Sequence, residues 1–259
     1  MRPDSPMPPP EARGGWLYRA FIRRPWHFAA IALLLVITGL RPFMRRVPDP
    51  PPVMLQLPEF SLVDQDGQAF TNASLKGKVT VAGFIFTSCP STCPKISRAM
   101  LELQQRYVRN GVDVELVSFT VDPENDTPAV LQRYADNLGA DQTRWRFVTG
   151  PLADVEKLIV GGFKTAIERG RKPPPGSDPV TMYDIAHSEQ LVLIDEHGGV
   201  RGFYAVRRNP DVPREPLPMG VHASPEAEAL GLDVLSLDEL YHRSTHVLRE
   251  QRQPGGCAR

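Results

Sequence analysis

Hydrophobic positions switch between strand-like and helix-like spacing over residues 56–207. Residues 79–86 form an unbroken apolar run, which is typical of a strand buried on both faces of a sheet. Apolar residues then recur at helical spacing from about residue 95, and residues 112–121 alternate with the period of a strand. The pattern predicts one α/β domain whose mixed sheet is flanked by helices.

Turn residues divide the rest of this region. Asp66-Gly67 predicts a hairpin near the start of the domain, and residues 195–199 predict another between strands at 190–194 and 200–206. The run Asp126-Thr127-Pro128 is typical of a helix start, with a capping residue followed by proline in the first turn. A further helix is expected over residues 151–163.

The N-terminus shows a different pattern. Residues 1–25 are a polar tail, and the next fifteen residues carry no charge. Extending that run to Met44 approaches the ~20 residues of a spanning helix if Arg41 reaches the membrane interface. Arginines on both sides argue against a buried core helix, and the missing small-x-small site argues against a signal peptide. We therefore expect a transmembrane anchor over residues 26–44.

The distribution of arginines also bears on orientation. Four of them lie within fifteen residues before the apolar core, against three after it. The positive-inside rule then slightly favours a cytoplasmic N-terminus. We expect a single-pass protein of the inner (cytoplasmic) membrane, with its soluble domain on the periplasmic or extracytoplasmic side.

Prolines cluster at the boundaries between the expected parts of the chain. Its 27 prolines are about twice the average share of ~5%. Residues 45–55 predict a stiff proline-rich linker between anchor and domain. Residues 208–259 form a C-terminal extension, in which residues 237–248 predict one helix capped by Ser236. The 30 basic and 30 acidic residues cancel, so bulk charge favours neither a nucleic-acid partner nor an acidic one.

Two cysteines in the run CPSTCP carry the clearest chemistry. Cys89 and Cys93 follow the buried strand and precede the expected helix, where unpaired N–H groups and the helix dipole favour thiolate over thiol. Such a pair can exchange disulfides or bind a soft metal. Thioredoxin-type catalysts use a two-residue spacing, whereas three residues separate these sulfurs. Peroxiredoxins place Thr or Ser three residues before the attacking cysteine, and Phe86 and Pro90 stand there instead.

One of the six histidines stands apart from the others. His187 directly precedes the strand at 190–194, where the sheet could bring it near the two thiols. The other five are expected to be ordinary surface or interfacial residues. The third cysteine, Cys257, is expected to be an inert thiol on a frayed tail.

Three motifs together resemble the Sco/SenC family of copper-binding, thioredoxin-like proteins. They are FIFTSCPSTCP at 84–94, SFTVDPENDTP at 118–128 and AHSEQLVLIDEHGGVRGFY at 186–204. The resemblance covers roughly residues 55–207 and implies a membrane-anchored domain used in cytochrome c oxidase assembly. Its partners would be the copper-bearing subunit of the oxidase and other copper chaperones.

The same resemblance implies a ligand set. Cys89, Cys93 and His187 would bind copper, since soft sulfur and imidazole suit Cu(I) and a nitrogen donor also tolerates Cu(II). Residue types alone would suit zinc equally well. Asp122 and Asp126 match the family's acidic pair, for which we favour a structural role in a turn and a helix cap.

The chain departs from the family at three places. Ala186 replaces the aspartate that many members have before the histidine, with Asp184 the nearest upstream carboxylate. A carboxylate there would orient the imidazole. Residues 172–175 lie in the loop leading to His187, and the extension after Arg208 is longer than usual.

Three functions follow in order of preference. The first is a copper metallochaperone and thiol reductant that helps to build the dinuclear copper centre of cytochrome c oxidase. The alternative is a metal-free thiol–disulfide oxidoreductase or a peroxiredoxin-like enzyme. A redox or copper sensor ranks last, because the short N-terminal tail contains no signalling module.

Overall fold

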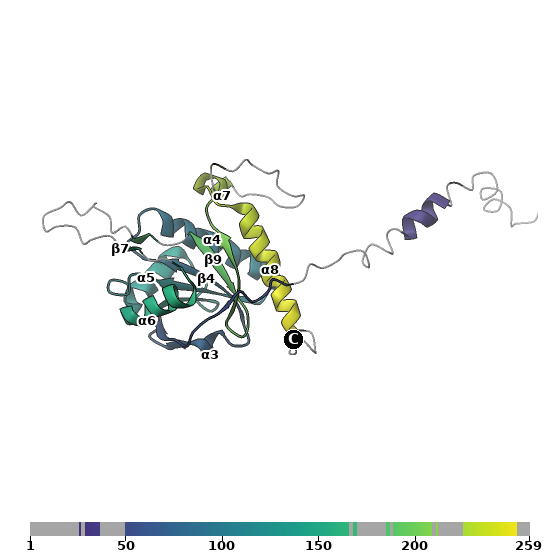
Figure 1. The fold of residues 1–259 in the computed structure, drawn as a ribbon. Coiled ribbons are helices and arrows are strands. Elements are labelled where there is room, and N and C mark those ends of the chain that lie inside the picture. The colour runs from purple at the N-terminus through teal and green to yellow at the C-terminus, as the bar shows by residue number, and fades with distance from the viewer. Residues whose placement is uncertain are drawn as a thin grey trace, which may run out of the picture. The chain divides into compact units, whose positions relative to one another are not determined.

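The chain divides into two units, residues 1–49 and residues 50–259 (Figure 1). A computed structural model describes residues 26, 29–36, 50–165, 168–169, 185–186, 189–208, 211 and 225–252. Within the first unit residues 29–36 are helical, inside the predicted anchor. No helix among the described residues is both long and apolar enough to cross a bilayer, and the rest of the predicted anchor lies outside them.

The second unit is built on an eight-stranded mixed sheet with the order β1-β10-β9-β4-β5-β6-β2-β3. The central strands β4, β5 and β6 are parallel, and the other pairs are antiparallel. The predicted mixed α/β sheet is therefore confirmed. Its strands are β1 (Leu55–Gln56), β2 (Ser61–Asp64), β3 (Ala69–Thr71), β4 (Val79–Ile85), β5 (Val114–Thr120), β6 (Trp145–Thr149), β9 (Gln190–Ile194) and β10 (Gly199–Ala205).

Short helices and two long ones connect and cover these strands. They are α3 (Asn72–Leu75), α4 (Thr92–Arg109), α5 (Pro128–Leu138), α6 (Leu152–Glu156), η1 (Lys157–Gly162), α7 (Pro225–Leu230) and α8 (Val234–Arg252). The expected helix at 151–163 is split into α6 and the wider turns of η1. Two more strands, β7 (Glu168–Arg169) and β8 (Ile185–Ala186), pair separately from the main sheet.

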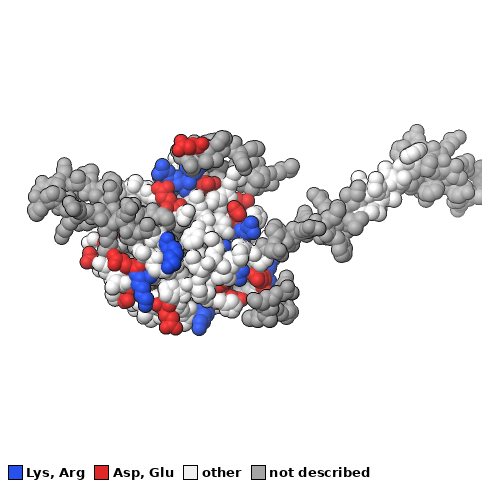
Figure 2. Space-filling view, viewed as in Figure 1, with Lys and Arg blue, Asp and Glu red and all other residues white. Residues whose placement is uncertain are grey.

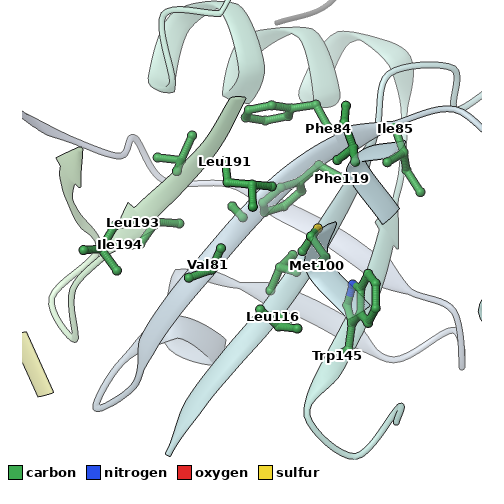
Figure 3. Close-up of a cluster of buried hydrophobic side chains, with 14 of the residues drawn as sticks. Val81, Phe84, Ile85, Met100, Leu116, Phe119, Trp145, Leu191, Leu193 and Ile194 are labelled. Atoms are coloured by element: carbon green, nitrogen blue, oxygen red, sulfur yellow. The ribbon is translucent and has the colours of Figure 1, made fainter. Parts of the chain in front are cut away.

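One face of the sheet is covered by α4, with α5 and α8 beside it. Gly83 of β4 permits this close packing, because a Cβ there would lie 2.7 Å from the Sδ of Met100 on α4. Figure 3 shows Met100 among the buried side chains of β4, β5, β6 and β9. Helix α5 is joined to α4 by a 2.7 Å hydrogen bond between Tyr134 and Ser97.

The opposite face is covered where η1 ends. The ring of Phe163 packs edge-on against Phe84 of β4, with ring centroids 5.1 Å apart, and lies 5.6 Å from the ring of Phe119 on β5. Phe84, Phe119 and Phe163 are all fully buried or nearly so. Helices therefore cover both faces, as the alternation of strands and helices predicted.

The end of the predicted linker lies against the edge of the sheet. Leu55 pairs with Val200 in the β1–β10 ladder, and the N–H of Met54 donates to the carbonyl of Val200 at 2.8 Å. Arg201 donates to the carbonyl of Pro51 at 2.8 Å and to the carboxylate of Asp195 at 2.7 Å. The chain is thus held by the domain from about residue 51 onward.

The C-terminal extension contributes α8 to the core. This helix includes the predicted residues 237–248 but begins at Val234, and Asp233 accepts from the N–H of Ser236 at 3.1 Å. The expected cap at Ser236 is therefore wrong, because Asp233 fulfils that role. Buried Ser244 hydrogen-bonds the hydroxyl of Tyr107 on α4 at 2.8 Å, which joins the two helices.

Charge is mixed over the surface of this unit. Figure 2 shows basic and acidic side chains interspersed on the face it draws, in keeping with the balanced composition. Charged side chains of this unit also form ion pairs, among them Lys78 with Glu115 at 2.6 Å and Arg106 with Asp238 at 2.6 Å.

Candidate functional site

The two cysteines of the CPSTCP run lie where β4 meets α4. Strand β4 ends at Ile85, and the N–H of Cys89 donates to the carbonyl of Phe86 at 3.2 Å to close the connecting turn. Cys89 is half-buried, whereas Cys93 is completely buried. Helix α4 begins at Thr92, three residues before the expected start near residue 95, so Cys93 belongs to its first turn. The predicted strand–helix location of the thiols is confirmed.

Hydrogen bonds bring the two sulfurs together. The N–H of Cys93 donates to the Sγ of Cys89 at 3.4 Å, and the N–H of Phe86 donates to the Sγ of Cys93 at 3.3 Å. Neither Cys89 nor Cys93 is in a disulfide. Each sulfur thus accepts from a backbone N–H of the segment that carries the other, which ties the end of β4 to the start of α4.

The two thiols have opposite acidities. The hydrogen bond from the Cys93 thiol, opposed by burial and aided by nearby backbone N–H groups, lowers the pKa of Cys89 to about 4. Donation to Cys89, together with burial, raises the pKa of Cys93. At neutral pH the pair therefore holds one thiolate at Cys89 and one thiol at Cys93.

A buried carboxylate supports the turn before Cys89. Asp126 accepts hydrogen bonds from the N–H and hydroxyl of Thr87 and from the hydroxyl of Thr120 on β5. Burial raises the pKa of Asp126, and the donors from Thr120 and Thr87 oppose this effect. Asp126 therefore joins the loop of Cys89 to the end of the neighbouring strand.

This placement corrects one expectation and confirms another. Helix α5 is capped at Thr127 without a side-chain hydrogen bond, so Asp126 is not its cap. The carboxylate points back to Thr87 instead, because its donors lie at the carboxyl ends of β4 and β5. Asp122 does form a turn, since its carbonyl accepts from the N–H groups of Asn125 and Asp126.

The segment leading into β9 reaches the same edge of the sheet. Strand β9 is antiparallel to β4, so Gln190 at its start lies toward the carboxyl end of β4, where the cysteines follow. The hydroxyl of Thr92, next to Cys93, donates to Glu189 at 3.1 Å. His187 itself lies outside the described residues, as do Asp184, residues 172–175 and Cys257.

The rest of the described chain presents no second cluster of metal-ligating side chains. Over the part of the chain that the structure describes, no three His, Cys, Asp or Glu side chains gather closely enough to hold an ion. The described portion of the predicted site is therefore the pair of sulfurs. Its chemistry is that of two soft donors, one of them already ionised.

Sequence reasoning missed the residues that support this pair. Thr87, Thr120 and Glu189 are polar residues at strand ends, and none of them belongs to a recognised ligand pattern. For Thr87 and Thr120 the available signal was positional, because side chains at the carboxyl ends of adjacent parallel strands meet at one edge. Glu189 reaches the same edge from the start of β9, which is antiparallel to β4. This position does not predict which residue each of the three side chains contacts.

Comparison with known proteins gives a consistent result. The family model SCO1/SenC matches residues 52–217. A "SCO1 protein homolog" from Bacillus subtilis is 34% identical over 150 residues, which cover 58% of this chain and 73% of the relative. The "SCO2-like protein RT0576" from Rickettsia typhi is 32% identical over 146 residues, or 56% of this chain and 68% of that protein.

Solved structures agree in fold. A SCO1/SenC family lipoprotein from Bacillus anthracis has a TM-score of 0.59 at 25% identity, covering 76% of this chain and 97% of its own. BsSco, described as a member of the Sco family of cytochrome c oxidase assembly proteins with a disulfide switch, has a TM-score of 0.51 at 31% identity, covering 74% and 99%. Bradyrhizobium japonicum ScoI with copper bound has a TM-score of 0.50 at 26% identity, covering 60% and 93%. With its thiol pair at the strand–helix junction and its family match over most of the folded unit, the chain belongs to the SCO1/SenC family.

Proposed function

We propose that this protein is a copper metallochaperone and thiol reductant that assists assembly of the dinuclear copper centre of cytochrome c oxidase. The observation that carries the proposal is the Cys89–Cys93 pair, held together at the start of α4 by reciprocal backbone hydrogen bonds. Family membership supports the assignment, as do the relatives described with copper bound or as oxidase assembly proteins.

Copper fits the chemistry of the donors. Two sulfurs, one ionised at neutral pH, suit soft Cu(I), and the expected third ligand is His187. The antiparallel course of β9 and the Thr92–Glu189 hydrogen bond support this choice, because they bring the chain two residues after His187 beside Cys93. An imidazole nitrogen would also let the site accept Cu(II).

Thiol exchange uses the same pair in a defined order. The more exposed Cys89 thiolate attacks a partner's disulfide, forms a mixed disulfide and releases one partner thiolate, which takes up a proton. Cys93 then loses its proton and attacks the Cys89 sulfur, which releases the second partner thiol. The dithiol becomes a disulfide and supplies the two electrons that reduce the partner. This reaction also underlies the metal-free alternative, a general thiol–disulfide oxidoreductase.

The setting of this activity belongs to the same proposal. Residues 26–44 would anchor the protein as a single span in the inner membrane, with the folded domain on the periplasmic side. Its partners would be the copper-bearing subunit of the oxidase and other copper chaperones. Treatment of intact spheroplasts with a protease tests this orientation. The domain should be digested before the spheroplasts are lysed.

An anaerobic Cu(I) titration against a chromogenic competitor tests the ligand set. The full chain carries Cys257→Ser so that two thiols remain, and Cys89→Ser, Cys93→Ser and His187→Ala are compared with it. Each of these three substitutions should weaken Cu(I) binding by at least about tenfold, because the loss of a residue that only orients a ligand already costs that much. His197→Ala, at an exposed hairpin tip, is the matched control and should bind normally. Unchanged affinity in both Cys89→Ser and His187→Ala would contradict the three-ligand site.

A second assay separates the alternative function. A peptide disulfide is added to the copper-free protein and to the copper-loaded protein. The copper-free form should reduce the peptide, whereas the copper-loaded form should not, because the metal occupies both sulfurs. Rapid turnover of hydrogen peroxide would instead favour the peroxiredoxin-like alternative. That outcome would remove copper from the primary role.

A further inference from the structure

A buried carboxylate holds the turn that ends at Cys89. This turn begins at Phe86 and is closed by the hydrogen bond from the N–H of Cys89 to the carbonyl of Phe86. Its first central residue, Thr87, donates to Asp126 from its N–H at 3.1 Å and also from its hydroxyl. Asp126 is only 1% exposed and belongs to a different segment of the chain, so it fixes the turn from outside.

The end of β5 sets the position of this carboxylate. Thr120, the last residue of β5, donates its hydroxyl to Asp126 and accepts from the N–H of Asp122 at 3.0 Å. The N–H of Asp126 donates to the carbonyl of Asp122 at 2.9 Å. Since β5 pairs with β4 along the whole length of both strands, the sheet places the carboxylate beside Thr87.

The same turn also contacts the buried sulfur. Phe86, next to Thr87, donates its N–H to the Sγ of Cys93 at 3.3 Å, while the N–H of Cys93 donates to the Sγ of Cys89 at 3.4 Å. A hydrogen bond to an ionised acceptor is about twice as strong as one to a neutral acceptor. The bond to the Cys89 thiolate is therefore stronger than the same bond to a disulfide sulfur, and this geometry favours the reduced pair.

We propose that Asp126 is a positioning residue that holds the Phe86–Cys89 turn so that the Cys93 N–H reaches the Cys89 sulfur, which favours the reduced pair over its disulfide. The inference rests on the thiol-exchange part of the proposed function and adds a residue that sets its reduction potential. Only the reduced pair can bind Cu(I) through both sulfurs or reduce a partner. Asp126 would thus keep the site ready for either reaction.

The charge of Asp126 acts against this effect of position. Donation to Cys89 and burial raise the pKa of Cys93, and the charge of Asp126 adds to the increase. A carboxylate that disfavours thiolates also disfavours the reduced pair. Position and charge therefore predict opposite shifts of the reduction potential when Asp126 is replaced.

The test measures the reduction potential of the pair at pH 7 in the full, copper-free chain with Cys257→Ser. The protein is equilibrated with glutathione and glutathione disulfide, and mass spectrometry counts the alkylated thiols. Each protein disulfide that is reduced takes two electrons and two protons from two glutathione thiols, which form one glutathione disulfide. The melting temperature of each variant is measured in parallel.

Two variants separate position from charge. Asp126→Ala removes the contacts with Thr87 together with the negative charge. Thr87→Val removes one hydrogen bond with little change in shape and leaves the charge in place. Thr87→Ser restores the hydroxyl donor and tests for rescue.

Asp195→Ala is the matched control. Asp195 is 2% exposed and accepts from the N–H groups of His197 and Gly199 at 3.0 and 2.7 Å, so it too is a buried carboxylate that holds a turn. It directly follows β9, which is antiparallel to β4, and therefore lies toward the end of β4 opposite the cysteines. Its loss should lower the melting temperature and leave the reduction potential unchanged.

Asp126→Ala should shift the equilibrium toward the disulfide by about tenfold, which corresponds to a potential ~30 mV more negative. Thr87→Val should shift it in the same direction by about threefold, because one of the hydrogen bonds is lost. Thr87→Ser should return the potential to that of the parent. If Asp126→Ala does not fold, Thr87→Val and its rescue decide the question.

Two results would overturn this inference and leave the proposed function in place. One is a parent-like potential in both Asp126→Ala and Thr87→Val, as in Asp195→Ala. The other is a shift toward the dithiol in Asp126→Ala with no change in Thr87→Val, which would mean that Asp126 acts through its charge. If the parent neither forms the disulfide with glutathione nor reduces a peptide disulfide, the thiol-exchange function itself fails.

Discussion

The backbone N–H of Cys93 donates to the Sγ of Cys89 across 3.4 Å, so the first turn of α4 stabilises a sulfur in the loop that precedes it. The two sulfurs differ in exposure, since Cys93 is buried and Cys89 is partly open to solvent. The pair therefore consists of a partly exposed thiolate at Cys89 and a buried thiol at Cys93. This asymmetry makes Cys89 the more accessible and more nucleophilic of the two sulfurs at neutral pH.

The low pKa of Cys89 predicts that its alkylation rate is nearly independent of pH around neutrality. With Cys257→Ser in the background, the rate with iodoacetamide should vary little between pH 6 and 8 and should fall at acid pH with a midpoint near the pKa of about 4. An ordinary thiol, with a pKa of about 8.5, would instead react nearly tenfold faster per pH unit over that range. Peptide mass spectrometry measures the modification of Cys89.

Variants at Cys93 test the cause of the low pKa. Cys93→Ala removes the main donor and should move the midpoint toward that of an ordinary thiol. Cys93→Ser keeps a hydroxyl donor and should move it less. A parent rate that climbs tenfold between pH 6 and pH 7 would contradict the assignment of the thiolate to Cys89.

Asp126→Ala should destabilise the domain through the loop before Cys89. The substitution leaves the donors of Thr87 and Thr120 without their acceptor. A buried polar group left unpaired costs about 1–3 kcal/mol, so the free energy of unfolding should fall by about 2–4 kcal/mol in urea titrations. Asp136→Ala, on the exposed side of α5, should stay within about 0.5 kcal/mol of the parent. Equal losses in the two variants would deny Asp126 its supporting role.

Gly83→Ala should disturb the contact between β4 and α4. The added methyl group would lie 2.7 Å from the Sδ of Met100 and 3.2 Å from a methyl group of Leu191. Overpacking of this kind costs about 1–3 kcal/mol, to be measured by chemical denaturation. Gly161→Ala is the control, because nothing lies within 4 Å of its added carbon. A Gly83→Ala protein as stable as the control would show that the helix can move away without cost.

Ser244→Ala should weaken the attachment of α8. Ser244 donates to the carbonyl of Tyr241 and therefore accepts from the hydroxyl of Tyr107. Its removal leaves that buried hydroxyl unpaired, at an expected cost of about 1–3 kcal/mol in the free energy of unfolding. Thr245→Ala, one residue further along the helix, removes only a solvent-exposed hydrogen bond to the carbonyl of His242 and should be nearly neutral.

A double variant separates the hydrogen bond from general packing at this contact. Tyr107→Phe combined with Ser244→Ala removes the unpaired hydroxyl and should recover part of the loss. If the double variant is as unstable as the sum of the two single variants, the hydrogen bond is not the reason for the effect. Thermal and urea unfolding of the four proteins gives the comparison.

Elements defined by their own apolar pattern could be predicted closely. β4 and β9 match the predicted runs at 79–86 and 190–194 to within one residue, because a strand buried on both faces must be apolar along its length. The start of α4 was placed too late, because its first turn contains Thr92, Cys93 and Pro94 and none of the large apolar residues that mark the helical period. The N–H of Cys93 in that turn donates to the Cys89 sulfur, a contact that the helical period does not encode.

Elements that depend on a distant partner could not be predicted. β1 consists of two residues next to a proline-rich stretch, and its pairing with β10 makes it a strand. Asp126 has the sequence context of a helix cap, and only the approach of Thr87 turns its carboxylate toward the cysteine loop. The cap of α8 moved from Ser236 to Asp233 because packing against α4 and the sheet extends the helix.

By itself the sequence determined the α/β class, the strand–helix position of Cys89 and Cys93 and the resemblance to the Sco/SenC family. These follow from local periodicity and from short motifs, each contained within a few residues. Only the tertiary structure decided which sulfur is partly exposed and ionised, that Asp126 supports the loop of Cys89 and that Glu189 meets Thr92 beside Cys93. Those features arise from contacts between segments far apart in the chain, whose geometry exists only once the sheet has aligned β4, β5, β9 and β10.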